Sequence, residues 1–107
     1  MSETQEIIEI IKEKRELLST LGHRVRIDLK DAGSILVDAT KPDVAVTEAD
    51  EDTEADTTIT LSSENMQKLL TGKLNAMWAY TLGQLKIEGS QSVALKLSSL
   101  LKEQEAS

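Results

Sequence analysis

The 107-residue sequence contains no cysteine and no phenylalanine, and it has one proline, one tryptophan and one tyrosine. The lack of cysteine excludes disulfides, thiolate nucleophiles and cysteine-ligated metal sites. With so few aromatic residues, the core must be built from Leu, Ile, Val, Ala and Met. No apolar run reaches the roughly 20 residues of a membrane-spanning helix, and the acidic start lacks the features of a signal peptide. We therefore expect a soluble, cytoplasmic protein.

Basic side chains are outnumbered by acidic ones, and the formal net charge is −7 at pH 7. This balance disfavours nucleic acid as a partner, because affinity for nucleic acid comes mainly from Lys and Arg on phosphates. It also disfavours stable docking on anionic lipid, which leaves at most a transient membrane contact through a local apolar patch. Residues 48–56 contain six acids and no base. They lack the glycine and the bidentate Glu of a calcium loop, so we expect a solvated loop that protects strand edges.

The spacing of apolar residues predicts the secondary structure. A helix is expected over residues 4–21, with Ile7, Ile11 and Leu18 on one stripe, Ser2 or Thr4 as its cap and Gly22 at its end. Alternation with period two then predicts four strands. They cover residues 23–30, 34–40, 43–49 and 57–62.

After residue 62 the period is helical again. A short helix capped by Ser62 or Ser63 is expected to end at Gly72, and a second apolar turn covers residues 74–82. A fifth strand over 84–88 and a final helix from Ser90 or Ser92 follow. Helices and strands are largely separate in sequence, which is typical of the α+β class. We expect one domain over residues 1–107, with a five-stranded, mainly antiparallel sheet and helices covering one face.

No catalytic pattern stands out in the sequence. His23 is the only histidine, and no neighbour in sequence makes it an obvious base or metal ligand. A nucleophile elbow, a phosphate loop and a dinucleotide fingerprint are absent. We therefore expect no enzymatic activity, no bound metal and no cofactor.

The segment 74–82, "LNAMWAYTL", is apolar nearly all round and holds the only Trp and the only Tyr. A helix that is apolar on every side is buried or faces something apolar. Two interpretations stay open: a core helix, or one wall of an apolar cavity in which Met adapts to ligands of varied shape.

Residues 59–101, "ITLSSENMQKLLTGKLNAMWAYTLGQLKIEGSQSVALKLSSLL", resemble the C-terminal half of the sterol carrier protein type two family. The shared features are a strand with a polar cap and short helix, the Gly72–Lys73–Leu74 element, an apolar segment, a Gly-x-Leu-x-Ile-x-Gly strand at 83–89 and a final helix. Tyr80 and Thr81 stand where that family is often rich in Phe. The proline common after Gly-Lys-Leu is also missing.

The resemblance implies an apolar tunnel between helices and sheet that holds a fatty acyl chain, an acyl thioester or a sterol-like molecule. The implied tunnel residues are Met66, Leu70, Leu74, Met77, Trp78, Leu82, Leu85, Leu97 and Leu101. The expected partner is a lipid or another apolar small molecule, with a homodimer as a further possibility. The alternative is a non-catalytic accessory or dimerisation domain of the same fold with no bound lipid.

Overall fold

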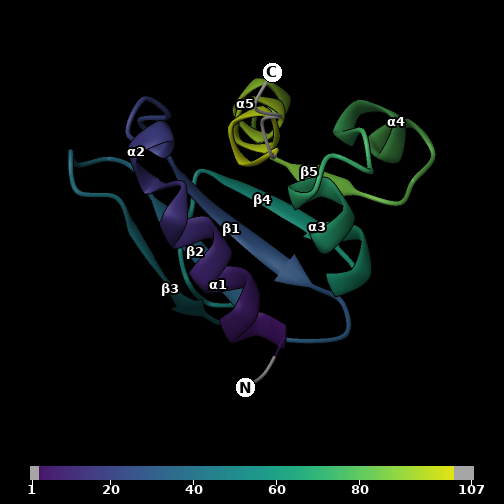
Figure 1. Ribbon diagram of the computed structural model, residues 1–107, viewed down its shortest axis with the longest axis horizontal. Helices are drawn as coiled ribbons and strands as arrows, with labels where there is room; N and C mark the ends of the chain where they lie inside the picture. Colours follow the sequence, from purple (N-terminus) through teal and green to yellow (C-terminus); the bar gives the residue numbers. More distant parts are fainter. Residues whose placement is uncertain (1–2, 103–107) are drawn as a thin grey trace.

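A mixed five-stranded sheet carries helices on one of its faces (Figure 1). The computed structural model describes residues 3–102. Its elements, in chain order, are α1 (Glu3–Glu13), α2 (Arg15–Leu18), β1 (Arg24–Leu29), β2 (Ser34–Asp38), β3 (Ala45–Ala49), β4 (Thr57–Leu61), α3 (Ser63–Leu70), α4 (Ala76–Thr81), β5 (Lys86–Glu88) and α5 (Gln91–Leu101). The predicted α+β class, the five strands and the helices on one face are confirmed.

The strands lie in the order β3-β2-β1-β4-β5. Three of the four pairings are antiparallel, as predicted, and β1 with β4 is parallel. The register aligns apolar residues in rows across the sheet, because Ile27 lies between Ile35 and Ile59, and Ile59 pairs with Ile87. These side chains share the helix-covered face, where Ile27, Ile35 and Ile59 belong to the buried core and Ile87 packs against it.

The acidic loop between β3 and β4 makes the parallel pairing possible. Ala49 lies at the Ser34 end of the sheet, whereas Thr57 pairs with Val25 at the other end, so residues 50–56 must return along the sheet. Arg26, on the polar face of β1, donates to the carbonyl oxygens of Glu51 (2.7 Å) and Thr53 (2.9 Å).

The expectation that this loop protects strand edges is therefore wrong, because the loop lies against a central strand of the sheet and not against an edge strand. It runs over the polar face of β1, and the guanidinium of Arg26 holds it there. The same guanidinium also binds both carboxylate oxygens of Asp28, at 2.9 and 3.1 Å, so one cation orients a loop and a strand.

The first predicted helix is two helices. The chain departs from helical geometry at Lys14 (φ −103°, ψ 10°), whose N–H bonds to the carbonyl of Ile11 in a tighter turn. The predicted stripe nevertheless holds, because Ile7, Ile11 and Leu18 are all buried. Thr4 is not a cap: it lies inside α1 and its hydroxyl accepts a bond from the N–H of Gly33. Ser2, the other candidate cap, lies outside the described residues.

Side-chain caps set the starts of the three C-terminal helices. Ser62, Asn75 and Ser90 each have extended backbone and accept hydrogen bonds from N–H groups in the first turn of α3, α4 and α5. The capped starts at Ser62 and Ser90 agree with the sequence prediction. Each cap removes the cost of unsatisfied N–H groups and so fixes where the chain turns into a helix.

Candidate functional site

An open groove of about 300 Å³ lies between the α3–α4 region and α5. Its apolar wall comes from residues of α3, the α3–α4 loop, α4 and α5, and its polar side comes mainly from the end of α5. The lining consists of Leu69, Leu74, Asn75, Ala76, Met77, Leu95, Ser98, Ser99 and Lys102. The volume is at the lower end of the range for small-molecule sites, about 300–1,000 Å³.

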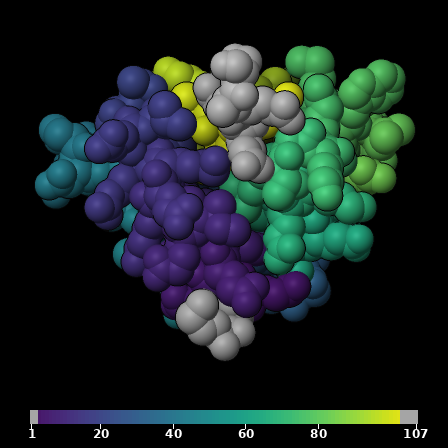
Figure 2. Space-filling model, in the orientation of Figure 1, coloured from purple at the N-terminus to yellow at the C-terminus, as the bar shows by residue number. Residues whose placement is uncertain are grey.

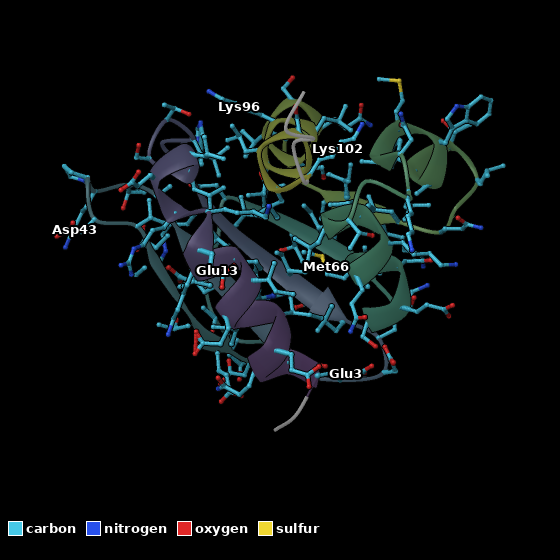
Figure 3. The ribbon with its side chains drawn as sticks, viewed as in Figure 1. Glu3, Glu13, Asp43, Met66, Lys96 and Lys102 are labelled. Carbon is cyan, nitrogen blue, oxygen red and sulfur yellow. The ribbon has the colours of Figure 1, made fainter. Side chains whose placement is uncertain are left out.

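A much smaller void, about 10 Å³, lies among buried side chains of β1, β4, α3 and α5. It holds at most about one water molecule, and its nearly apolar lining favours a dry space. The lining consists of Ile27, Ile59, Leu61, Met66, Leu69, Leu97, Ser98 and Leu101. Figure 3 shows Met66 near the centre of the molecule, between α3 and the sheet.

Leu69 and Ser98 line both the groove and the void. Leu69 is 3% exposed, and Ser98 turns its hydroxyl back to the carbonyl of Ala94 at 3.0 Å, so it exposes little polarity to either space. These two side chains lie between the open groove and the small void in the core. The apolar space between helices and sheet is thus divided in two in this structure.

The nine sequence-predicted site residues fall into three groups. Leu74 and Met77 line the groove. Met66, Leu97 and Leu101 line the void. The remaining four are brought to neither space: Leu70 and Leu85 are buried in the core, and Trp78 and Leu82 are exposed. The role of all nine in ligand binding stays a prediction.

Helix α4 forms one rim of the groove, but few of its side chains pack into the core. Ala79 is its one fully buried residue, and the N–H groups of Gln84 and Leu85 bond to the Ala79 carbonyl. The amide of Gln91 donates to the hydroxyl of Tyr80, which joins α4 to α5. Most apolar side chains of segment 74–82 therefore lie at the surface or in the groove, and Ala79 is the one buried in the core.

The sequence profile of a family described as "SCP-2 sterol transfer family" matches residues 5–102. The chain belongs to this family. The resemblance seen over residues 59–101 thus extends over nearly the whole described chain, including the N-terminal helix and the hairpin. A domain of this family is of the lipid-binding and lipid-transfer type.

Several relatives support the assignment. The peroxisomal multifunctional enzyme A of Dictyostelium discoideum is 44% identical over 78 residues, which are 70% of this chain and 15% of that protein. Sterol carrier protein 2 of Rattus norvegicus is 45% identical over 51 residues, 48% of this chain and 9% of that protein. The SCP-2 chain therefore spans only a small part of these relatives.

Solved structures share the fold. The sterol carrier protein domain 2 of Helicoverpa armigera has a TM-score of 0.76 at 25% identity, with 92% of this chain and 85% of that one covered. Apo sterol carrier protein 2 from Yarrowia lipolytica has a TM-score of 0.74 at 24% identity, covering 89% and 86%. The second likeness concerns the fold alone.

Among the described residues of this SCP-2 domain, the only histidine lies beside an acidic side chain. His23 lies 3.8 Å from Asp56, and both side chains are about half exposed, so the pair is weak. Within residues 3–102, no group of three or more His, Asp or Glu is placed to hold a metal ion. No helix in that range is long and apolar enough to cross a bilayer.

Sequence reasoning missed four polar residues of the groove. The polar residues Asn75, Ser98, Ser99 and Lys102 were not expected there. Leu69, Ala76 and Leu95, which also line the groove, were left out of the predicted set. One signal was available for Leu95: it lies off the core stripe of the last helix, so it gives α5 a second apolar side. Ser98, Ser99 and Lys102 carry no such signal, because only packing brings the end of α5 beside α4 and its N-cap Asn75.

Proposed function

We propose that this SCP-2 domain reversibly binds a lipid with a long acyl chain and an anionic end, such as a fatty acid or an acyl thioester. The observation that supports it most is the groove itself. Five of its nine lining residues are apolar, and Ser99 and Lys102 belong to its polar side. This combination matches an amphiphile better than a wholly apolar ligand.

In the proposed pose the acidic end lies near Lys102, and the chain runs along Leu74, Met77 and Leu95. Each methylene removed from water contributes about 0.8 kcal/mol, so a long chain offsets the free-energy cost of association. The charged end contributes less, because an exposed ion pair is worth about 0–1 kcal/mol. Chain length therefore decides affinity, and the head group decides orientation.

A long chain needs more room than the groove offers. We propose that its end displaces Leu69 and enters the space beneath, between α3 and α5, where Met66, Leu97 and Leu101 would surround it. In this state the groove and the void become the tunnel that the sequence predicts. A ligand favours the open state only as far as it binds that state more tightly, so longer chains are expected to open it and short ones are not.

The test is native mass spectrometry of the delipidated protein with a long-chain fatty acid, the fatty alcohol of equal length and a sterol. Lys102→Met should weaken acid binding about two- to fivefold, the range of an exposed ion pair, and leave alcohol binding unchanged. The matched control is Lys96→Met, because Lys96 donates to the carbonyl of Thr20 and does not line the groove. Binding of the sterol alone would contradict the proposed acyl ligand.

One observation favours the alternative of an accessory or dimerisation domain. Met77 and Trp78 on α4 and Leu82 just after it are more than 60% exposed, which is typical of an interaction surface. Absence of co-purified lipid and of any saturable loading, together with a stable dimer, would favour this alternative. Neither proposal assigns a catalytic role, a metal or a cofactor to the domain, and the cytoplasmic location stays a prediction.

A further inference from the structure

The charge of the chain is divided unequally along the sequence. Residues 1–64 contain 16 acidic and 7 basic side chains, whereas residues 65–107 contain 5 lysines and 3 glutamates. The acidic protein thus has a C-terminal part with a small positive charge. Figure 3 shows that Lys96 and Lys102 lie at the same end of the molecule as α4, and that Glu3 lies at the opposite end.

The most exposed apolar side chains lie in this C-terminal part of the chain. Met77, Trp78 and Leu82 on and beside α4 are exposed by 61%, 65% and 64%; we call these three the α4 patch. Outside α4 and its C-cap, the other exposed large apolar side chains of the described residues are Ile10 and Leu17, which are less exposed, at 36% and 45%. Figure 2 shows the α4 segment, in green, projecting at the margin of the molecule.

Lysines flank the α4 patch. Lys73 precedes the N-cap of α4 and is exposed, and its N–H bonds to the carbonyl of Lys68 at the end of α3. Lys102 lines the groove together with Met77. Lysine side chains can lie along apolar surface with their ammonium groups in water. Surfaces that bind the interface of a bilayer typically combine apolar side chains, including tryptophan, with lysines around them.

We propose that the α4 patch docks on an anionic bilayer surface, so that the mouth of the groove faces the membrane. This inference rests on the proposed lipid-binding function, since it supplies the source of the bound lipid. Met77 belongs to both the patch and the groove lining, so docking places the entrance of the site at the acyl-chain boundary. Lipid can then pass between bilayer and groove without crossing bulk water.

An anionic bilayer fits the patch better than the other occupants do. The patch has only three large side chains, whereas a stable protein interface buries roughly 1,200–2,000 Å² in total. A bilayer needs no shape complementarity, and anionic lipids attract each lysine near the surface. Helix α1 cannot serve instead, because Glu6, Glu9 and Glu13 are exposed on it beside Lys12 and anionic lipid repels them.

The experiment is co-sedimentation of the full chain with phosphatidylcholine vesicles that contain or lack phosphatidylglycerol. Emission of Trp78 is followed in parallel, because it is the only tryptophan. We expect binding and a blue shift with the anionic vesicles only, and both should decline as salt is added. The double substitution Met77→Ser and Leu82→Ser should abolish both signals. Lys73→Glu should weaken binding at least about fivefold, the contribution of one lysine near such a surface.

Two matched controls separate the α4 patch from general effects of charge and apolarity. Leu17→Ser removes an exposed apolar side chain at a distant site on α2, and Lys41→Glu makes the same charge change in the loop between β2 and β3. Both should bind anionic vesicles as the unaltered protein does. Thermal melts of all variants check folding, and the substituted side chains are exposed, so the melts should hardly change.

Three results would overturn the inference: no binding to anionic vesicles, equal binding of the double variant, or equal losses in the control variants. A dimer that the double variant abolishes, with no vesicle binding, would assign the patch to a second copy of the chain. Loading with fatty acid in the absence of vesicles is measured on the same samples. If loading persists while vesicle binding fails, the docking inference is wrong and the proposed function stands; if loading fails, the proposed function is wrong.

Discussion

Replacing Leu69 by alanine tests whether the groove extends into the core. Leu69 is 3% exposed and lines both the groove and the void. Truncation of a buried leucine costs about 2–5 kcal/mol, depending on how far the site collapses. Because the groove is open to solvent, we expect a cost near the low end, about 2–3 kcal/mol. In a chain of this size each kcal/mol lowers Tm by about 4–8 °C.

The same substitution should improve lipid binding. With the side chain of Leu69 shortened, an acyl chain reaches further toward the sheet, and two additional buried methylenes would contribute about 1.6 kcal/mol, or somewhat more than tenfold in affinity. A ligand at 100 times its Kd stabilises a protein by about 2.7 kcal/mol. At one lipid concentration, the rise in Tm should therefore be larger for Leu69→Ala than for the unaltered protein.

Leu18→Ala is the matched control. Leu18 is fully buried and lines neither the groove nor the void, so this substitution should lower Tm without changing the shift that lipid produces. The assay is a thermal melt with and without fatty acid, beside native mass spectrometry for affinity. An equal lipid shift in Leu69→Ala, Leu18→Ala and the unaltered protein would refute the idea that Leu69 separates the groove from the proposed tunnel.

Three further predictions concern the scaffold. The hydroxyl and the N–H of Ser63 donate hydrogen bonds to Asp31 and lower the pKa of its carboxyl from the ordinary value. Because this pKa is lower in the folded than in the unfolded state, the stabilisation is complete above about pH 5 and is lost as pH falls through the folded-state pKa. Chemical denaturation at several pH values should accordingly show Asp31→Asn converging on the unaltered protein in acid. Gly89→Ala should lower the free energy of unfolding by more than the strain of a left-handed residue, about 1–3 kcal/mol, because φ is +101° and the new Cβ would lie 2.5 Å from a backbone carbonyl oxygen. Gly22→Ala should cost that strain alone, because φ is +72° there and no atom lies within 4 Å of the new Cβ. Denaturation midpoints of the two variants test the difference. Calorimetry with calcium should show no saturable heat from residues 48–56, because the glycine and bidentate Glu of a calcium loop are missing there, and a one-site isotherm would contradict this.

The periodicities of the sequence were sufficient for the fold class. Alternation over β1, β2 and β4 put Val25, Ile27, Ile35 and Ile59 on one face, and the structure buries them all. Such local patterns can be read because side chains alternate in strands and repeat every 3.6 residues in helices. The break at Lys14 left no mark in the pattern, since the residues on either side keep the same buried stripe.

The parallel pairing of β1 with β4 was decided by tertiary structure. Nothing in the spacing of residues 48–56 indicates that the loop returns along the sheet, because this depends on bonds from Arg26 to carbonyl oxygens about 25 residues away. The charge of the loop was visible in sequence. Its place on the polar face, beside two arginines of β1, was not.

The sequence by itself determined that residues 74–82 are apolar nearly all round, but not what each side contacts. Only the tertiary structure buried Ala79, set Met77 at the groove and left Trp78 exposed. The physical reason is that a six-residue helix makes few contacts of its own. Its orientation is set by groups outside it: the N–H groups of Gln84 and Leu85 donate to the Ala79 carbonyl, and the amide of Gln91 donates to the Tyr80 hydroxyl. Burial is a property of that orientation, which no local periodicity encodes.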